Sequence, residues 1–296
     1  MRRLDLDQMQ LFAAVARRRS FRAAATELGM SASTLSQAVR DLEARLGARL
    51  LNRTTRSVSL TEAGDRLLAA LAPALAELSR AVDQIHEVEG ECAGSLRLNA
   101  PEPAIDLVLA PMIAGFLRQH PRVRVEVVAQ TALIDIVAQG FDAGVRWDEA
   151  LAQDMVAVPL SGEQRYVIVA SPARLAEDGG PPNHPHDLLG RPCARVRFAS
   201  GLTPPWEFER GEETIRLDPT GPLICANIAL SRQAALAGAA YVLAFEAYVA
   251  EDIAAGRLVS VLDAWLPPFP GPKLYFPSRR QMPAPLRAFV DYVKRT

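Results

Sequence analysis

The segment from residue 20 to residue 64 constrains the fold more than any other part of this 296-residue chain. Ser20 precedes a short run of apolar residues that ends at Gly29, and Ser31 precedes a longer run that ends at Gly47. Serine is a preferred helix N-cap, and glycine commonly follows the last turn of a helix. The pattern therefore predicts two short helices joined by a tight glycine turn.

Apolar spacing gives each of these helices one inward face. From the first, the side chains expected inside are Ala24, Ala25 and Leu28. The second has a stripe with spacings of 4, 3 and 4 residues, formed by Leu35, Val39, Leu42 and Leu46. An earlier helix is predicted from the spacing of Leu6, Met9, Phe12, Val15 and Ala16. Residues 49–60 predict a short, arginine-rich β-hairpin. Helices followed by such a hairpin have the layout of a winged helix-turn-helix, which reads duplex DNA.

The charge of the chain is divided unevenly, in agreement with this interpretation. Residues 1–64 contain eleven arginines and six acids, a net charge of +5. Because the whole chain has a net charge of -1, the remaining residues have a net charge of -6. A basic head on an acidic body fits a DNA-binding module joined to a body with another task.

The second helix of the pair is expected to present its N-terminal half to the major groove. Its exposed positions are Ala32, Ser33, Thr34, Ser36, Gln37 and Arg40. Gln37 can bond adenine at N6 and N7, hydroxyls can donate or accept, and an alanine methyl can touch thymine. On the hairpin, phosphate or minor-groove contacts are expected from Arg53, Thr54 and Arg56. Two further arginines, Arg45 and Arg49, are expected to form ion pairs. Their expected partners are Glu43 and Asp41.

A long helix is predicted after the hairpin, with Thr61 as its cap. Its apolar residues alternate by three and four positions: Leu68, Leu71, Leu75, Leu78, Val82 and Ile85. This heptad seam predicts that the helix pairs with a copy of itself. Pro73 lies inside the helix and predicts a kink, because an interior proline costs about 3 kcal/mol. Residues 90–94 are expected to form a hinge.

From residue 95 onward, short β-rich runs alternate with helical runs. Strands are expected over 95–99, 122–128 and 165–170, and helices over 107–118, 131–139 and 230–237. This alternation predicts an α/β body with largely parallel sheets. Its length of about 200 residues suits two small lobes better than one. The proline- and glycine-rich stretch 266–272 is expected to lead the chain back to the first lobe.

These residues resemble the LysR-type transcriptional regulators over the whole chain. In the head the resemblance is carried by Ser20-Phe21-x-Ala23-Ala24, Ser31-x-x-x-Leu35-Ser36, Leu42-Glu43-x-x-Leu46-Gly47, Leu50-Leu51-x-Arg53 and Leu60-Thr61-x-Ala63-Gly64. In the body it is carried by Phe141-Asp142-Ala143-Gly144-Val145-Arg146, Asp154 to Leu160, Ala170-Ser171-Pro172, Trp206-Glu207-Phe208, Gly221-Pro222-Leu223 and Pro277 to Gln281.

The resemblance implies a multidomain chain that combines α+β and α/β parts. A winged helix-turn-helix is expected over residues 1–64 and a linker and dimerisation helix over 65–91. A two-lobed, Rossmann-like effector-binding domain that resembles a periplasmic binding protein is expected over 92–296. Lobe 1 would span about 92–164 and 267–296, and lobe 2 about 165–266.

The family resemblance also implies the partners of this chain. A regulator of this kind binds double-stranded promoter DNA at an interrupted palindrome. A small-molecule effector bound between the lobes changes its shape and so switches transcription. The assembly would be a homo-oligomer, dimeric through the linker helix and tetrameric overall, with RNA polymerase as a further partner. No cofactor, no metal and no membrane contact are expected, and the expected location is the cytoplasm.

Effector contacts are expected where the lobes meet, at the carboxyl ends of strands. The candidates are Asn99, Ala100, Glu102, Thr131, Arg146, Ser200, Thr203 and Asn227. Glu102 departs from the family pattern and would repel an anion, which favours a neutral or cationic effector. A Glu102 that points to solvent is an equal alternative. For Arg146, a structural ion pair with Asp142 is favoured over an effector contact, and Trp206 is expected to pack inside its lobe.

Three other functions remain as alternatives. A redox-sensing regulator would need an exposed, acidic thiol; Cys193 has arginines nearby, but a buried, inert thiol is the favoured interpretation. An enzyme is disfavoured, because the four histidines lack metal-ligand spacing and no phosphate loop or nucleophile elbow is present. The pair His184 and His186 is expected to be loop structure. A solute-binding protein would match the two lobes but leaves the basic head unexplained.

Overall fold

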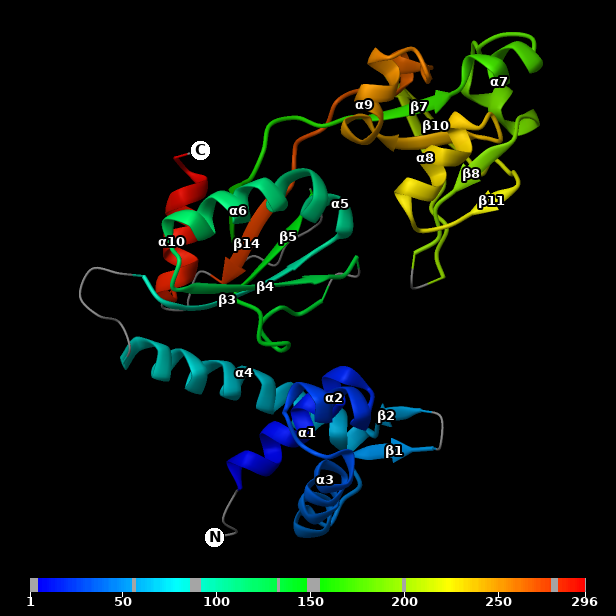
Figure 1. Ribbon diagram of the computed structural model, residues 1–296. Helices are drawn as coiled ribbons and strands as arrows, with labels where there is room; N and C mark the ends of the chain where they lie inside the picture. The colour runs from blue at the N-terminus through cyan, green and yellow to red at the C-terminus, as the bar shows by residue number, and fades with distance from the viewer. Residues whose placement is uncertain are drawn as a thin grey trace.

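The computed structural model describes residues 5–54, 57–85, 92–131, 134–147, 155–198, 201–277 and 282–295. Three parts follow one another along the chain (Figure 1). A helical head with a two-stranded hairpin comes first, a long helix leads away from it, and two sheet-containing lobes complete the molecule.

The head contains α1 (Leu6–Arg18), α2 (Phe21–Glu27) and α3 (Ala32–Leu46). The predicted caps are confirmed: Ser20 Oγ accepts from the backbone N–H of Ala23, and Ser31 Oγ accepts from that of Thr34. Gly47 ends α3 with a φ of 67°, a conformation that glycine adopts without strain. One core joins the three helices; among its fully buried residues are Phe12, Val15, Ala24, Leu35 and Val39. The inward placement of Leu28 is wrong: α2 ends at Glu27, and Leu28 is 39% exposed.

The wing is formed by β1 (Leu51–Arg53) and β2 (Val58–Leu60), which pair antiparallel with Leu51 opposite Leu60. The helix α4 (Glu62–Ile85) follows directly. As predicted, Thr61 caps it, because Thr61 Oγ1 accepts from the backbone N–H of Gly64 at 3.1 Å. Gly64 is needed here, since a Cβ at this position would lie 2.1 Å from the Leu50 carbonyl oxygen.

Part of the heptad seam of α4 packs against the head of the same chain. Leu71 belongs to the head core, and Leu68 and Leu75 pack against it. Leu78 is 47% exposed, whereas the side chains of Val82 and Ile85 lie outside the described ones. α4 runs through Pro73 as one helix. Self-pairing of the helix therefore stays a prediction for its C-terminal half, while its N-terminal half stabilises the head.

The first lobe contains a five-stranded sheet in the order β4-β3-β5-β14-β6. Its strands are β3 (Gly94–Ala100), β4 (Val123–Ala129), β5 (Ala143–Arg146), β6 (Met155–Pro159) and β14 (Lys273–Pro277). Its helices are α5 (Glu102–Ala104), the π-helical turn η1 (Ile105–Leu109), α6 (Ala110–Gln119) and α10 (Ala284–Val293). α6 and α10 meet through Phe116 and Phe289, whose ring centroids are 5.2 Å apart.

The second lobe contains a five-stranded sheet in the order β11-β8-β12-β7-β13. Its strands are β7 (Tyr166–Ala170), β8 (Cys193–Arg195), β11 (Leu223–Ile224), β12 (Tyr241–Phe245) and β13 (Val259–Val261), with a separate hairpin of β9 (Trp206–Arg210) and β10 (Glu213–Leu217). Its helices are α7 (Pro172–Glu177), η2 (Pro185–Gly190), α8 (Ile228–Leu236), α9 (Glu246–Ala254) and η3 (Asp263–Trp265). Trp206 is 4% exposed in the core of this lobe, as predicted.

Both sheets are mixed, which corrects the expectation of largely parallel sheets. In the first lobe β3 pairs parallel with β4 and β5, whereas β14 pairs antiparallel with β5 and β6. The second lobe repeats this pattern around β7. The reason is the chain crossing: β14 starts opposite Arg146, where β5 ends, and β7 starts opposite Phe245, where β12 ends. Each of these two strands begins at the edge of its sheet where the chain crosses between the lobes. It is therefore antiparallel to the strands that end at that edge.

Two of the three predicted body helices are present. Residues 107–118 fall within η1 and α6, and residues 230–237 overlap α8. The helix expected over 131–139 is wrong for the described part of that range, because residues 134 and 135 are irregular and residues 136–140 form turns. Asp135 Oδ1 accepts from the backbone N–H groups of Val137 and Ala138, and this local bonding competes with a helix. The crossing over 266–272 is confirmed, and Phe269 pairs there with Gln164 on the outgoing crossing.

Candidate DNA-binding surface and inter-lobe site

The helix α3 presents a polar face to solvent while its apolar stripe holds it on the head. Leu35, Val39 and Leu42 are at most 3% exposed. The predicted reading residues lie on the other side: Ala32, Ser33, Thr34, Gln37 and Arg40 are exposed, and Ser36 is half-buried. The sequence therefore placed all six residues on one accessible face. Apolar periodicity was sufficient for this, because the stripe fixes which face points inward.

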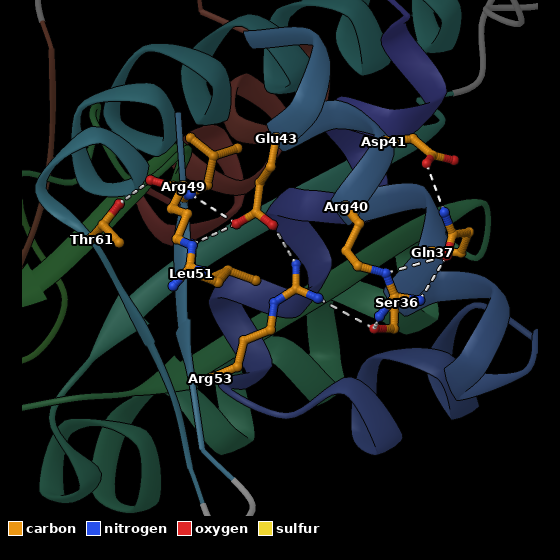
Figure 2. A network of polar contacts seen from close by, with 10 residues as sticks. Ser36, Gln37, Arg40, Asp41, Glu43, Arg49, Leu51, Arg53 and Thr61 are labelled. Atoms are coloured by element: carbon orange, nitrogen blue, oxygen red, sulfur yellow. Dashed lines mark hydrogen bonds and ion pairs between the residues drawn. The ribbon is translucent and has the colours of Figure 1, made fainter. Parts of the chain in front are cut away.

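The polar residues of this face form a hydrogen-bonded network (Figure 2). Arg40 donates from Nε and Nη2 to Gln37 Oε1, at 3.2 and 2.7 Å, and from Nη1 to Ser36 Oγ at 3.0 Å. Gln37 Nε2 donates in turn to Asp41 Oδ1 at 2.8 Å. Four neighbouring side chains on one helix are thus held in defined orientations before any partner binds.

The carboxylate of Glu43 joins α3 to the wing. Its Oε1 accepts from the backbone N–H groups of Leu50 and Leu51 at 2.9 and 3.1 Å, and its Oε2 pairs with Arg53 Nη2 at 2.7 Å. Arg53 also donates to Ser36 Oγ at 3.3 Å, and its guanidinium lies over the ring of Phe21. Sequence reasoning missed this joint, because α3 and the wing meet only in the folded head.

The predicted ion pairs of Arg45 and Arg49 with Glu43 or Asp41 are wrong. Arg45 pairs with Asp5, the N-cap of α1, at 3.6 Å. The only Arg49 contact drawn in this network is its backbone carbonyl, which accepts from Thr61 Oγ1. Glu43 is occupied by Arg53 and the wing backbone instead.

The turn of the wing is closed by hydroxyl groups. Thr54 Oγ1 accepts from the backbone N–H of Ser57 at 2.9 Å, and the two hydroxyl oxygens are also 2.9 Å apart. Thr54 is exposed at the tip of the wing. Arg56 lies outside the described residues, so its predicted DNA contact stays a prediction.

In the body, two of the predicted effector residues form a buried pair at the ends of neighbouring strands. Arg146 Nη2 donates to Asn99 Oδ1 at 2.8 Å, and Asn99 Nδ2 donates to Gln130 Oε1 at 3.3 Å. Asn99 and Arg146 are fully buried, as is Ala100. Asp142, the predicted partner of Arg146, accepts through Oδ2 from the backbone N–H of Arg97. Arg146 bonds Asn99 because these two residues end adjacent strands.

The other predicted effector residues are more scattered. Glu102 is exposed at the start of α5, and Thr131 is exposed just after β4. Thr203 is half-buried and accepts from Arg197 Nε, whereas Asn227 is the exposed N-cap of α8 and accepts from the backbone N–H of Leu230. Ser200 lies outside the described residues. The structure thus brings together Asn99, Ala100 and Arg146 but not the whole predicted set.

The lobes also meet through side chains that sequence reasoning missed. Tyr248 on α9 donates to Asp106 Oδ2 on η1 at 3.0 Å. Burial, followed by this bond, raises the pKa of the Tyr248 hydroxyl. Beside it, Trp147 after β5 stacks on Phe245 at the end of β12, with ring centroids 5.3 Å apart. The signal available in the sequence was the position of Trp147 and Phe245 at strand ends.

The cysteine and histidine side chains on which the alternative functions would depend have structural roles. Cys193 is fully buried on β8, and burial raises the pKa of its thiol to about 12. His184 caps η2, and its ring stacks on that of His186 at 5.0 Å. Within the described ranges, no group of three His, Cys, Asp or Glu side chains is arranged to hold a metal ion. In the same ranges, no helix has both the length and the apolarity needed to span a membrane.

The fold and the exposed face of α3 define a class of protein: a winged helix-turn-helix DNA-binding head joined to a two-lobed body. Comparison with known proteins agrees. Residues 6–65 match the family described as "Bacterial regulatory helix-turn-helix protein, lysR family", and residues 89–296 match the "LysR substrate binding domain". The chain therefore belongs to the LysR-type transcriptional regulators, with a DNA-binding domain and an effector-binding domain.

Similar proteins span the whole chain. It is 39% identical over 292 residues to YcaN of Escherichia coli strain K12, described as an uncharacterised HTH-type transcriptional regulator; the match covers 99% of this chain and 95% of that protein. It is 37% identical to the HTH-type transcriptional regulator PtxR of Pseudomonas aeruginosa, covering 98% and 92%. Two full-length structures, each covered to 99% on both sides, share the fold. They are the Vibrio cholerae virulence activator AphB, with a TM-score of 0.67 and 24% identity, and CrgA from Neisseria meningitidis, with a TM-score of 0.59 and 26% identity.

Proposed function

We propose that α3 enters the major groove of promoter DNA and that its exposed polar face reads the bases. The single observation that carries this is the combination of a buried stripe with an opposite face of six accessible reading residues, Ala32, Ser33, Thr34, Ser36, Gln37 and Arg40. A recognition helix needs this division, because one face must hold the domain while the other reaches base edges.

The wing is proposed to contact the sugar–phosphate backbone through Thr54 and Arg56. Arg53 has a different task in this proposal, because Glu43 and Phe21 already hold its guanidinium. We assign to Arg53 the fixing of the wing against α3. The proposed head covers residues 1–64 and the proposed linker residues 65–91, which agrees with the start of α4 at Glu62.

The effector is proposed to bind in the body, residues 92–296, between lobe 1 (about 92–164 and 267–296) and lobe 2 (about 165–266). The parallel strands of both sheets end at the edge where the chain crosses between the lobes, and ligands of open α/β sheets bind outside such ends. Asn99 and Arg146 are the favoured contacts. The exposed carboxylate of Glu102 at the same edge favours a neutral or cationic effector.

The proposed assembly is a homodimer through the exposed part of α4, and a tetramer formed from two such dimers. Leu78, on the exposed part of the seam, supports the dimer contact. Contact with RNA polymerase and a cytoplasmic location follow from promoter binding in this proposal. No catalytic step, metal or cofactor is assigned to the chain.

The test is selection of genomic DNA fragments by the purified full-length protein, repeated across a salt series. Enrichment of an interrupted palindrome is expected, and Gln37→Ala should lose part of that sequence preference. Gln233→Ala, which changes the same residue type on the exposed face of α8, is the matched control and should bind like the parent. Binding that depends on salt but enriches no sequence would contradict the proposal.

A further inference from the structure

Two hydrogen-bond acceptors on the reading face of α3, Gln37 Oε1 and Ser36 Oγ, are already occupied by donors from the protein itself. Gln37 Oε1 receives two N–H groups of Arg40, at 2.7 and 3.2 Å. Ser36 Oγ receives one N–H from Arg40 at 3.0 Å and one from Arg53 at 3.3 Å. An amide oxygen and a hydroxyl oxygen each have two lone pairs, so both oxygen atoms have their accepting capacity filled.

The orientation of the Gln37 amide follows from the chemistry of its neighbours. A guanidinium can only donate, and an ionised carboxylate can only accept. Arg40 therefore faces the amide oxygen of Gln37, and Asp41 faces its NH₂ group, as the 2.8 Å contact from Gln37 Nε2 to Asp41 Oδ1 shows (Figure 2). A reversed amide would place two donors against each other at one end and two acceptors at the other.

What Ser36, Gln37 and Arg40 keep toward solvent consists of donors, whereas the carboxylate of Asp41, beside them on α3, still has acceptor capacity. Ser36 keeps its O–H, Gln37 keeps one N–H on Nε2, and Arg40 uses three of its five N–H groups in the network. We infer that Ser36, Gln37 and Arg40, with the Gln37 amide oriented by Asp41, form a donor-only surface on α3 that selects a base with two acceptors in the major groove. This inference rests on the proposed role of α3 in base reading.

Guanine is the base that fits. Its O6 and N7 are both acceptors in the major groove, whereas adenine pairs the N7 acceptor with an N6 donor. The N6 donor would meet a donor surface, because Gln37 Oε1 has no accepting capacity left. The two-point bond of a glutamine to adenine is thus blocked while Arg40 covers the amide oxygen. Arg40 acts as a positioning residue that sets which base Gln37 accepts.

The first arm of the experiment selects duplexes from a library with a fully randomised core, using the full-length protein and Gln37→Ala. Positions whose base preference disappears in Gln37→Ala are the positions that Gln37 reads. Guanine is expected there. Replacing that guanine by 7-deazaguanine in the selected duplex removes one acceptor and should weaken binding by about two- to tenfold. This measurement uses the unchanged protein, so it does not depend on how a variant folds.

The second arm tests the positioning role of Arg40. Arg40→Met keeps most of the side-chain length but uncovers Gln37 Oε1, so the preference at the same positions should move from guanine toward adenine. A loss of affinity alone, with guanine still preferred, would show that Arg40 does not control the amide. Arg45→Met is the matched control: it removes an exposed arginine of the same helix that pairs with Asp5, and the guanine preference should persist.

The outcomes distinguish a failure of the donor-only surface from a failure of the proposed base reading. Adenine at the Gln37-dependent positions of the parent protein, or no position that depends on Gln37, would overturn the donor-only surface while leaving sequence-specific binding intact. A library in which neither protein enriches any sequence would overturn the proposed base reading itself. Guanine at those positions together with the shift in Arg40→Met supports the inference.

Discussion

The carboxylate of Glu43 on α3 and the guanidinium of Arg53 on β1 are 2.7 Å apart, and both side chains are largely shielded from solvent, at 13% and 25% exposure. Glu43 also accepts from the backbone N–H groups of Leu50 and Leu51. One side chain of α3 therefore binds both the backbone of the wing and its Arg53 guanidinium. This joint sets the position of the wing relative to α3, on which the proposed simultaneous contact with groove and phosphates depends.

Glu43→Gln should loosen this joint. The amide that replaces the carboxylate places an NH₂ group against either Arg53 or the wing backbone, all of which are donors, and an unsatisfied donor costs about 1–3 kcal/mol. Hydrogen exchange at the Leu50 and Leu51 amides should become roughly tenfold or more faster, because 1.4 kcal/mol is a factor of ten. Glu62→Gln is the control, since its pair with Arg66 is exposed and 3.7 Å long. Equal exchange in both variants would contradict the joint.

Arg53→Ala tests whether Arg53 holds the wing or contacts phosphate. Log affinity falls as log salt rises, and a lost phosphate contact reduces the magnitude of this negative slope by about 1. Because Arg53 is bound to Glu43, we expect a slope that changes by well under 1, together with faster exchange at the wing amides. The measurement is DNA affinity of the full-length protein at several salt concentrations. A full unit of slope lost with unchanged exchange would make Arg53 a phosphate contact.

Asp252 is expected to give the second lobe a pH-dependent stability. Its side chain is fully buried, and its bonds to Arg232, and also to Arg257 at 2.6 Å, hold the pKa of the carboxyl below its usual value. A depressed folded pKa means that the contribution is present above the unfolded pKa of about 3.9 and is lost as the pH falls through the folded pKa.

The corresponding variant is Asp252→Asn. It should lower the free energy of unfolding by about 2 kcal/mol at pH 7, less than for a fully buried pair, because both arginines are partly exposed. The difference from the parent should shrink below about pH 4. Denaturant titrations at several pH values measure it, with Glu213→Gln as the exposed-pair control. A difference that stays constant down to pH 3 would contradict the assignment.

Cys193 should resist alkylation in the folded protein. Its thiol is fully buried, and with a pKa of about 12 almost none of it is thiolate at pH 8. Cys225 is half-buried and should react before Cys193. Mass spectrometry after timed iodoacetamide treatment distinguishes the two, and denaturant should make both react. Rapid labelling of Cys193 together with a change in DNA affinity would contradict this prediction and support the redox-sensing alternative.

Tyr248→Phe should loosen the contact between the lobes. It removes only the hydroxyl that donates to Asp106, a bond whose net contribution is on the order of 1 kcal/mol. A pair of fluorescent labels, one on each lobe, should report a broader distance distribution than in the parent. Tyr292→Phe, on α10 within the first lobe, should leave the distribution unchanged. The same distribution in both variants would remove Tyr248 from the lobe contact.

The head was predictable from sequence because its signals are local. The caps at Ser20 and Ser31, the left-handed Gly47 and the stripe through Leu35 and Val39 act within one or two helical turns. The body was predictable as two lobes, but its antiparallel strands were not, because β14 joins the first sheet from more than a hundred residues away. The site residues divide in the same way: the face of α3 follows from periodicity, whereas the Glu43–Arg53 and Asn99–Arg146 pairs form only when different elements of the fold meet.

The place of β14 between β5 and β6 determines the order in which this chain can fold during synthesis. The ribosome completes the strands of the second lobe, which end at Val261, before it makes Lys273–Pro277. Until then β5 and β6 of the first lobe lack the strand that joins them, and Phe289 of α10 has not yet covered the sheet. Of the two lobes, the one that starts first is therefore completed last, because its sheet needs a strand that is made after the whole second lobe.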